Sequence, residues 1–257
     1  MPNAEIITIG TELLLGEIVD TNTQVIARSL RSVGINLYRT STVGDNPKRI
    51  AQVVRESLSR ADIVITSGGL GPTVDDPTRE AVSSALDMGL EFRAELWDDI
   101  QDRLMKYDRE VTENNKRQAY IPEGAFALDN EWGTAPGFVA DDAMGVLICL
   151  PGVPPELERI LDKEVLPWLS SRFSLQEIIL TRSIKTEGIG ESKVDDIIGD
   201  LERSQNPTVG LAAHKGSVEL RITSRAESKE EAEREIQEMG NRLRQRLSKW
   251  IVEDKDA

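Results

Sequence analysis

Short apolar segments that alternate with amphipathic ones constrain the fold of this chain more than any other feature. Residues 4–10 and 61–66 are apolar runs typical of buried strands, and residues 36–43 form a further predicted strand. A segment with apolar residues at helical spacing follows each of them. This order predicts parallel βαβ units, so we expect an α/β domain whose parallel-dominated sheet carries helices on both faces.

The pattern changes near residue 170, so we expect two domains, residues 1–170 and 171–257. The second domain begins with a predicted strand and helix, which two strands and a long helix follow. The motif AHKGS is predicted to turn the hairpin between those two strands. This βαββα order predicts a small two-layer α+β domain. The expected elements span residues 177–185, 191–202, 208–214, 217–225 and 229–250.

Three helix starts carry capping signals. Thr21–Gln24 fits a capping box, Asn46 stands before a proline, and Asp76 stands before another. Residues 91–119 are predicted to be mainly helical and to form an excursion from the sheet. Asp141 and Asp142 are predicted to turn a hairpin into the apolar run GVLICL.

The composition excludes several classes of site. Cys149 and His214 are the only cysteine and histidine among 257 residues, so no intramolecular disulfide, cysteine metal cluster or multi-histidine metal site can form. The formal net charge of −14 argues against a nucleic-acid partner, which would need a basic surface. No apolar run approaches the ~18 residues of a membrane span, and the first ten residues lack a signal-peptide pattern. We therefore expect a cytoplasmic protein with no membrane partner.

Four loops are expected at the carboxyl ends of predicted strands, the edge at which open parallel sheets bind ligands. They are Gly10–Glu12, Gly44–Asn46, Gly68–Asp76 and Pro151–Pro154. An acidic chain that binds a phosphorylated small molecule there is expected to recruit a divalent cation, which offsets the charge of both partners.

The third loop, within SGGLGPTVDDPT, has the composition of a phosphate-binding loop without a lysine. Gly68, Gly69 and Gly71 permit positive φ and close backbone approach, so successive N–H groups can converge on a phosphate. A helix expected to open at Asp76 and Pro77 would add its positive dipole end. The spacing matches neither the Walker A motif nor the dinucleotide-binding fingerprint. A tight strand-to-helix turn explains the same glycines, and both interpretations stay open.

Acidic residues gather at the same predicted edge. Asp75 and Asp76 lie in the third loop and Asp45 in the second. They would repel a phosphate unless a Mg²⁺-type ion lay between them, where it would polarise a phosphoryl oxygen or activate a water. The simpler alternatives are an N-cap for Asp76, a solvated loop residue for Asp75 and a turn residue for Asp45. Further carboxylates expected on this rim are Glu12, Asp20 and Glu156.

Several longer motifs, in this order, make the chain resemble a known family. They include GTELLLGEIVDTN from Gly10, GGLGPTVDDPT from Gly68, NKRQAYIPEGA from Asn115, GTAPGF from Gly133 and LPGVPPE from Leu150, with GIGES and NPTVGLAAHKGSVELRIT in the second domain. They resemble the molybdopterin-binding fold family, and within it the CinA-like proteins (competence/damage-inducible protein A). The resemblance implies a three-layer α/β domain followed by a small KH-like domain.

The resemblance also implies a function, metal-dependent hydrolysis of ADP-ribose to AMP and ribose 5-phosphate. It implies a small-molecule nucleotide diphosphate as substrate, a divalent metal ion (Mg²⁺, Mn²⁺ or Co²⁺) and a homo-oligomer. The predicted catalytic residues are Asp45, Asp75 and Asp76, of which Asp45 and Asp76 are also the predicted metal ligands. The predicted substrate-binding residues are Gly10, Thr11, Glu12, Asn22, Gly68, Gly69, Leu70, Gly71, Thr73, Asn115, Lys116, Gln118, Thr134, Pro151, Gly152, Pro154 and Glu156.

Two other functions stay open, molybdopterin binding or adenylylation, and non-catalytic nucleotide sensing through the second domain. The KH-like resemblance also invites RNA binding. However, the turn from Glu187 to Glu191 has the wrong glycine spacing for a GXXG loop and acidic flanks, so we expect packing or subunit contacts there. Longer relatives carry a C-terminal amidase domain, for which the sequence up to Ala257 leaves no room, so we expect no deamidase activity.

Overall fold

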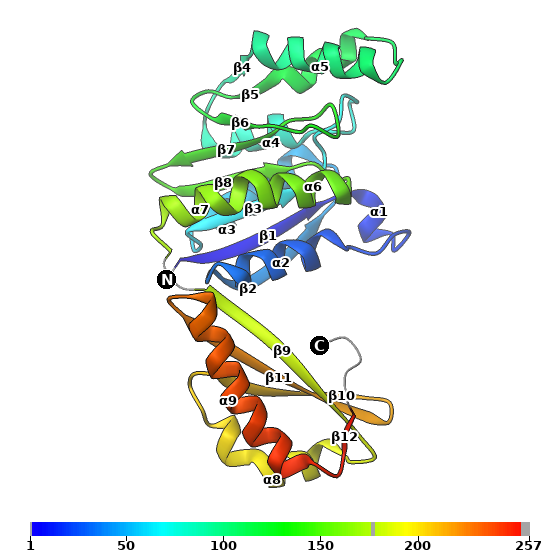
Figure 1. Ribbon diagram of the computed structural model, residues 1–257. Coiled ribbons are helices and arrows are strands. Elements are labelled where there is room, and N and C mark those ends of the chain that lie inside the picture. The colour runs from blue at the N-terminus through cyan, green and yellow to red at the C-terminus, as the bar shows by residue number, and fades with distance from the viewer. Residues whose placement is uncertain (1, 176–177, 253–257) are drawn as a thin grey trace. The chain divides into compact units, whose positions relative to one another are not determined.

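The computed structural model describes residues 2–175 and 178–252 of the chain (Figure 1). The chain divides into two compact units, with the main boundary between Ser174 and Leu175. The first unit contains the predicted α/β domain and the second the predicted α+β domain. Among the described residues, no helix is both long and apolar enough to cross a membrane.

A mixed sheet forms the centre of the first unit. Four neighbouring strands are parallel, and two antiparallel strands extend the sheet at one edge. The predicted parallel-dominated sheet is therefore confirmed, as is the hairpin at Asp141 and Asp142. In spatial order the strands are β2 (Asn36–Val43), β1 (Asn3–Ile9), β3 (Ile63–Ser67), β8 (Gly145–Leu150), β7 (Gly137–Asp142) and β6 (Phe126–Leu128).

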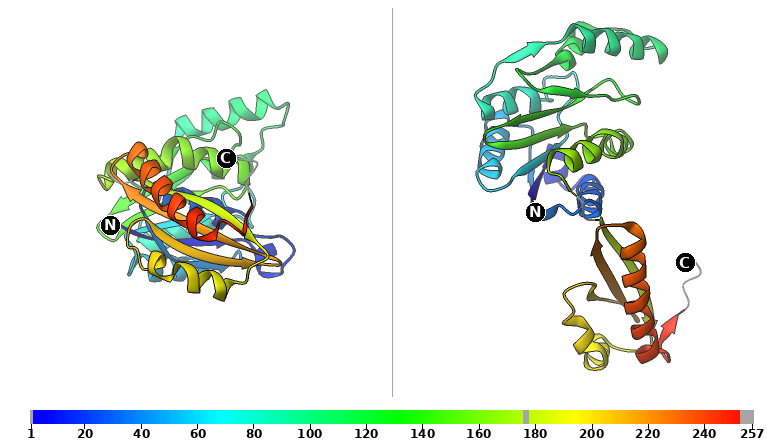
Figure 2. Two further views of the ribbon diagram at one scale, coloured as in Figure 1. Left: turned by 60° about the horizontal axis from the view of Figure 1, so that its bottom comes forward. Right: turned by 60° about the vertical axis from the view of Figure 1, so that its left-hand side comes forward.

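Helices cover both faces of this sheet, which gives the expected three layers. Helices α3 (Pro47–Leu58) and α4 (Thr78–Leu86) pack on one face through a core that includes Val54, Val82 and Leu147. On the other face lie α2 (Asn22–Ser32), α6 (Pro154–Ile160) and α7 (Leu166–Arg172), as Figure 1 and Figure 2 both show. A short π-helix, η2 (Leu161–Val165), joins α6 to α7. The carboxyl ends of β1, β2, β3 and β8 are left open between the two helical layers.

Two of the three capping expectations are wrong. Asn46 does cap α3, because its side chain accepts a hydrogen bond from the Arg49 N–H at 3.1 Å. At the start of α2 the N–H and hydroxyl of Thr23 donate to the Asp20 carboxylate. Asp20 therefore accepts the N-terminal hydrogen bond that was expected to come from the Thr21–Gln24 capping box. Asp76 makes no cap hydrogen bond to α4, whose N-cap is Pro77. Each carboxylate instead accepts hydrogen bonds from a threonine three positions away, Thr23 in the first turn of α2 for Asp20 and Thr73 in the same loop for Asp76.

The excursion after α4 is only partly helical. It begins with β4 (Leu90–Phe92) and α5 (Ala94–Lys106) and continues through a 3₁₀ helix, η1 (Glu113–Ala119), into β5 (Tyr120–Pro122). Strands β4 and β5 form a small antiparallel sheet of their own. The excursion matters for function because η1 carries three of the predicted substrate-binding residues. A single-turn helix, α1 (Thr11–Leu14), follows β1 at the same edge of the main sheet.

The second unit is the predicted two-layer α+β fold. Its elements are β9 (Ile178–Glu187), α8 (Glu191–Glu202), β10 (Thr208–His214), β11 (Ser217–Ala226) and α9 (Lys229–Leu247). The sequence expectation missed β12 (Ile251–Val252), a short edge strand that pairs with β9. Both helices and the antiparallel sheet share one apolar core. The predicted hairpin between β10 and β11 is confirmed, with Gly216 at a φ of 83° in its turn.

Candidate functional site

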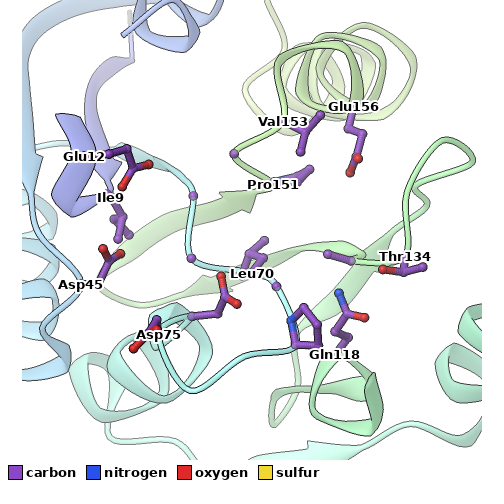
Figure 3. A pocket seen from close by; sticks show the side chains of 18 residues that line it. Ile9, Glu12, Asp45, Leu70, Asp75, Gln118, Thr134, Pro151, Val153 and Glu156 are labelled. Carbon is purple, nitrogen blue, oxygen red and sulfur yellow. The ribbon is translucent and has the colours of Figure 1, made fainter. Parts of the chain in front are cut away.

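A pocket of about 470 Å³ opens at the carboxyl edge of the main sheet (Figure 3). Loops from four strand ends contribute to it, and η1 and the loop before β7 close one side. Glu12 and Asp45 lie on one side, and Gln118, Thr134 and Glu156 lie on the opposite side. Its lining is Ile9, Gly10, Glu12, Asp45, Gly68, Gly69, Leu70, Gly71, Pro72, Asp75, Asp76, Gln118, Thr134, Ala135, Pro151, Gly152, Val153 and Glu156.

Most of the predicted site residues meet at this pocket, including all three predicted catalytic carboxylates. Six predicted substrate-binding residues do not line it: Thr11, Asn22, Thr73, Asn115, Lys116 and Pro154. Each of the six lies next to a lining segment. Pro154 is the first residue of α6, and Thr11 and Thr73 hydrogen-bond to lining carboxylates. Asn22 is buried, and its amide donates to the Ser67 hydroxyl and the Gly152 carbonyl, so it ties two pocket loops together from behind.

The two residues of η1 that stay outside the pocket have structural partners. Asn115 is buried, and its side-chain oxygen accepts hydrogen bonds from the N–H and hydroxyl of Thr112, which completes a capping box. Lys116 pairs with Glu113 and lies 5.7 Å from the centre of the Phe92 ring. Of the three, only Gln118 lines the pocket, whereas Asn115 and Lys116 have their partners within the excursion.

The first four carbonyl groups of the glycine-rich loop, those of Gly68 to Gly71, are bonded to the first turn of α4. The Gly68 carbonyl accepts from the Thr78 hydroxyl at 2.9 Å, and the Gly69 carbonyl accepts from the Thr78 N–H at 3.2 Å. The Leu70 and Gly71 carbonyls accept from the Arg79 guanidinium at 2.7 and 3.3 Å. Four successive carbonyl oxygens are thus held on the helix side of the loop.

These carbonyl hydrogen bonds determine where the N–H groups of the loop point. A trans peptide unit is planar, with its C=O and N–H directed to opposite sides. Because the carbonyls face α4, the N–H groups of Gly69, Leu70 and Gly71 face away from it, and these residues line the pocket. The three N–H groups make no hydrogen bond to any part of the chain that the structure describes. Adjacent unpaired N–H groups of this kind are a binding site for an anion such as phosphate.

Close packing explains why the loop needs glycine. Gly68 has a φ of 109°, and a Cβ atom there would lie 2.2 Å from the Ile9 carbonyl oxygen at the end of β1. Gly69 has a φ of 65°, and a Cβ atom there would lie 2.2 Å from the Thr78 hydroxyl. A Cβ on Gly152 would touch the Cα of Gly68 at 3.3 Å. The backbones of three strand ends therefore meet at the floor of the pocket, where only hydrogen atoms fit.

Asp45 and Asp76 are each fixed by one oxygen. The Oδ2 atom of Asp45 accepts from the Thr11 N–H at 2.8 Å, and the Thr11 hydroxyl accepts from the Asp45 N–H at 3.2 Å. The Oδ2 atom of Asp76 accepts from the N–H and the hydroxyl of Thr73 at 2.9 and 2.7 Å. Their Oδ1 atoms have no hydrogen-bond partner in the described part of the chain, nor do the carboxylates of Glu12 and Asp75.

These carboxylates fit a metal ion only if the ligand completes its coordination. Within residues 2–175 and 178–252, no three Asp, Glu, His or Cys side chains come together as a metal site. Mg²⁺ is commonly held by one or two protein carboxylates, with substrate phosphates and water as the other ligands. The free oxygens of Asp45 and Asp76, on the same pocket as the unpaired N–H groups, suit this arrangement.

The far wall of the pocket carries an unpaired amide. Gln118 is 1% exposed, and its Oε1 atom has no hydrogen-bond partner among the described residues. Glu156 is held differently, since its Oε2 atom accepts from the buried amide of Asn130 at 2.7 Å. An unpaired buried amide costs about 1–3 kcal/mol, which a polar ligand group would recover. Gln118 is thus a pocket-lining residue whose buried side-chain oxygen lacks a hydrogen-bond partner among the described residues.

Sequence reasoning missed two parts of the site. One is apolar and consists of Ile9, Pro72, Ala135 and Val153, which gives the pocket a hydrophobic lining beside its polar groups. The other is Arg79, which is buried beneath the glycine-rich loop. A signal for Arg79 was available, because it stands three and seven residues before Val82 and Leu86 on the core-facing side of α4.

Comparisons with known proteins agree with this architecture. The family model described as "Probable molybdopterin binding domain" matches residues 5–171, and the model described as "Damage-inducible protein CinA KH domain" matches residues 181–252. The chain belongs to the CinA-like family. The predicted family and fold class are thereby confirmed, with a molybdopterin-binding-type domain before a KH-like one. The pocket and all its lining residues lie inside the first match.

The relatives span nearly the whole chain. A "Putative competence-damage inducible protein" of Halothermothrix orenii is 40% identical over 96% of this chain. A "CinA-like protein" of Kosmotoga olearia is 43% identical over the same share. In both cases the chain spans about 60% of the relative's length. Among solved structures, a CinA protein of unknown function from Thermoplasma acidophilum matches with a TM-score of 0.59 and 34% identity, over 63% of this chain and 94% of that one.

Proposed function

We propose that the pocket is an active site for phosphoanhydride chemistry on a small phosphorylated ligand. The observation that carries this proposal is the row of three unpaired N–H groups at Gly69, Leu70 and Gly71. Such a row recognises a phosphate by hydrogen bonds to its oxygens, and it stabilises the negative charge that develops when the phosphorus is attacked. The Oδ1 atoms of Asp45 and Asp76, on the same pocket, are available as ligands for a cation.

The favoured reaction is metal-dependent hydrolysis of ADP-ribose to AMP and ribose 5-phosphate. Asp45 and Asp76 would hold the divalent ion, which would neutralise diphosphate charge and lower the pKa of a bound water. Water forms a new P–O bond at one phosphorus, and the bond from that phosphorus to the bridging oxygen breaks. Asp75, which has no partner within the described residues, accepts the proton of the attacking water. The loop N–H groups fix the phosphate in position throughout.

The second candidate function is binding or adenylylation of a molybdopterin. The family model that matches the first unit carries a molybdopterin-binding description, which supports this candidate directly. The same N–H groups would bind the phosphate of a pterin, and the Gln118 amide can pair with the amide edge of a pterin ring as well as with a nucleobase. The two candidates therefore share the phosphate site and differ in what fills the rest of the pocket.

Two assays separate these functions. The protein is incubated with ADP-ribose and Mg²⁺, Mn²⁺ or Co²⁺ in turn, and AMP is measured by chromatography. Release of AMP that EDTA abolishes supports the hydrolase, and absence of AMP with every metal removes ADP-ribose as a substrate. Thermal shift with ADP-ribose, FAD, ATP and a pterin then identifies the ligand class, because a ligand that binds only the folded state raises the melting temperature. Tight AMP or ADP-ribose binding without turnover in any metal would instead indicate a nucleotide sensor.

A homo-oligomer is the assembly that the family resemblance leads us to expect. Sedimentation-equilibrium measurements of the full chain give its mass directly. A monomer across the accessible concentration range would contradict this part of the proposal.

A further inference from the structure

A positive charge lies buried directly beneath the proposed phosphate site. Arg79 is only 2% exposed. Its guanidinium donates to the Leu70 and Gly71 carbonyls, and its Nε atom is buried without a hydrogen-bond partner. It forms no ion pair with any residue in the described ranges. A buried guanidinium whose hydrogen bonds go only to backbone carbonyls is an unusual arrangement, since proteins normally pair such charges.

The charge is present at neutral pH despite its burial. Burial lowers the pKa of Arg79 to about 10, and the carboxylates of Glu80 and Asp76 oppose that shift. The group therefore stays protonated at physiological pH. These carboxylates form no ion pair with Arg79, so keeping its charge inside the protein still costs free energy, and a further negative charge nearby would lower that cost.

The geometry shows where the compensating charge belongs. The Arg79 Nη2 atom donates to the Leu70 carbonyl at 2.7 Å, and the other end of that peptide unit is the N–H of Gly71. A guanidinium at the oxygen polarises the peptide unit, and hydrogen bonds in such a chain strengthen one another. An anion on the Gly71 N–H thus lies one peptide unit away from the guanidinium, in line with it.

We infer that Arg79 is the counter-charge of the bound phosphate and acts on it through the Leu70–Gly71 peptide. In this role it is a positioning residue that takes the place of the lysine found in other phosphate loops, while remaining out of contact with the ligand. The inference rests on the proposed function, because it requires a phosphate at the loop. Beyond the proposed function, the inference states that the affinity for phosphate depends on the positive charge of Arg79 as well as on the N–H groups of the loop.

A purely structural role for Arg79 makes a different prediction. If Arg79 only held the carbonyls in place, then Arg79→Lys, which loses the planar fork, would weaken binding about as much as Arg79→Gln, which keeps an amide donor but no charge. If the charge matters, the lysine variant retains most of the affinity and the glutamine variant does not. Arg117 offers a matched control, because it also donates to a loop carbonyl, that of Thr73, but is partly exposed and paired with Glu80 at 2.7 Å.

The test measures binding of inorganic phosphate to the full chain by ³¹P NMR titration, at fixed ionic strength and with the same concentration of Mg²⁺ in every sample. We expect Arg79→Gln to weaken phosphate binding at least ~10-fold, Arg79→Lys to stay within ~3-fold of the wild type, and Arg117→Gln within ~2-fold. Equal affinities for Arg79→Gln and Arg117→Gln, or equal losses for Arg79→Lys and Arg79→Gln, would overturn the inference. A wild-type protein that does not bind phosphate would overturn both the inference and the proposed function. If the wild type does bind phosphate, a negative result with the variants overturns only the inference about Arg79.

A second readout covers the case in which Arg79→Gln does not fold. AMP and adenosine differ only in the phosphate, so the ratio of their dissociation constants isolates its contribution. For Arg79→Lys we expect this ratio to stay close to that of the wild type. If Arg79→Lys bound adenosine as the wild type does but bound AMP no more tightly than adenosine, the charge of residue 79 would not be what stabilises the bound phosphate.

Discussion

Replacing Gly69 by alanine tests the central feature of the site, the close approach of the loop to α4. The backbone of Gly69 has a φ of 65°, and the added Cβ atom would lie 2.2 Å from the hydroxyl oxygen of Thr78. Thr78 is fully buried, so its side chain can escape only by rotating away. That rotation breaks its 2.9 Å hydrogen bond to the Gly68 carbonyl and leaves both groups buried without a partner.

The two costs can be estimated separately. A non-glycine residue in the left-handed region costs about 1 kcal/mol. Losing the buried hydrogen bond of Thr78 costs about 2 kcal/mol, because an unsatisfied buried polar group carries its full desolvation penalty. Gly69→Ala should therefore lower the free energy of unfolding of the first unit by about 3 kcal/mol.

Gly124→Ala is the matched control. Gly124 has a φ of 77°, close to that of Gly69, but a Cβ atom added there would have no neighbour within 4 Å. It should cost only the backbone penalty of about 1 kcal/mol. Both variants are compared by urea denaturation in a Trp250→Phe background, so that the fluorescence comes from Trp97 and the other first-unit tryptophans. Equal losses of stability in the two variants would refute the proposed contact between the loop and Thr78.

Three further outcomes follow from the structure. Asp76→Asn keeps an oxygen that can accept the hydrogen bonds of Thr73, so the melting temperature should change little, while metal-dependent AMP release should fall at least ~100-fold; a variant with full turnover would exclude Asp76 as a ligand. Hydrogen bonds from Arg221 and Ser183 lower the pKa of Glu219 from 4.5 to about 2, so the stability it contributes is present above pH 4.5 and lost as the pH falls toward 2. The difference in urea stability between the wild type and Glu219→Gln should shrink over that range, and a constant difference would contradict the shift. Burial raises the pKa of Cys149 to about 12, so iodoacetamide should label it only after unfolding; labelling of the folded protein at neutral pH would show that the strand opens.

Most of the fold could be predicted because local patterns and tertiary contacts agree. The apolar run at Ile63–Ser67 is buried on both faces of the sheet, and such a strand has few alternatives. Asn46 caps α3 because a cap needs only residues within one turn. The cap expected at Asp76 failed for a tertiary reason. The loop folds back on itself, and the carboxylate is taken by the N–H and hydroxyl of Thr73 before α4 begins.

The candidate site was predictable where chain direction alone determines position. Asp45, Asp76 and the glycines lie at strand ends, and the carboxyl ends of parallel strands share one edge. Asn115 and Gln118 come from η1, whose approach to the edge depends on how the excursion folds, so the sequence could not tell which of them faces the pocket. Arg79 was missed because a charged residue in a helix is usually exposed, although its spacing from Val82 and Leu86 places it on the core-facing side of α4.

The balance of charge around the pocket links the metal to the ligand. The loop N–H groups carry no net charge, and Arg79 provides one positive charge from behind them. The pocket lining carries more negative charges than this one positive charge, among them the carboxylates of Glu12, Asp45 and Asp76. The rim of the pocket is therefore negative when no cation is bound. An anionic diphosphate should therefore bind poorly alone, and a divalent ion should bind poorly without it, because no set of three protein ligands is present in the described chain. Each should raise the affinity of the other by the same factor. Calorimetric titrations with Asp75→Asn, which lacks the proposed proton acceptor, measure binding without turnover. ADP-ribose is titrated with and without Mn²⁺, and Mn²⁺ with and without ADP-ribose, and independent binding of the two would show that the carboxylates do not hold the ion.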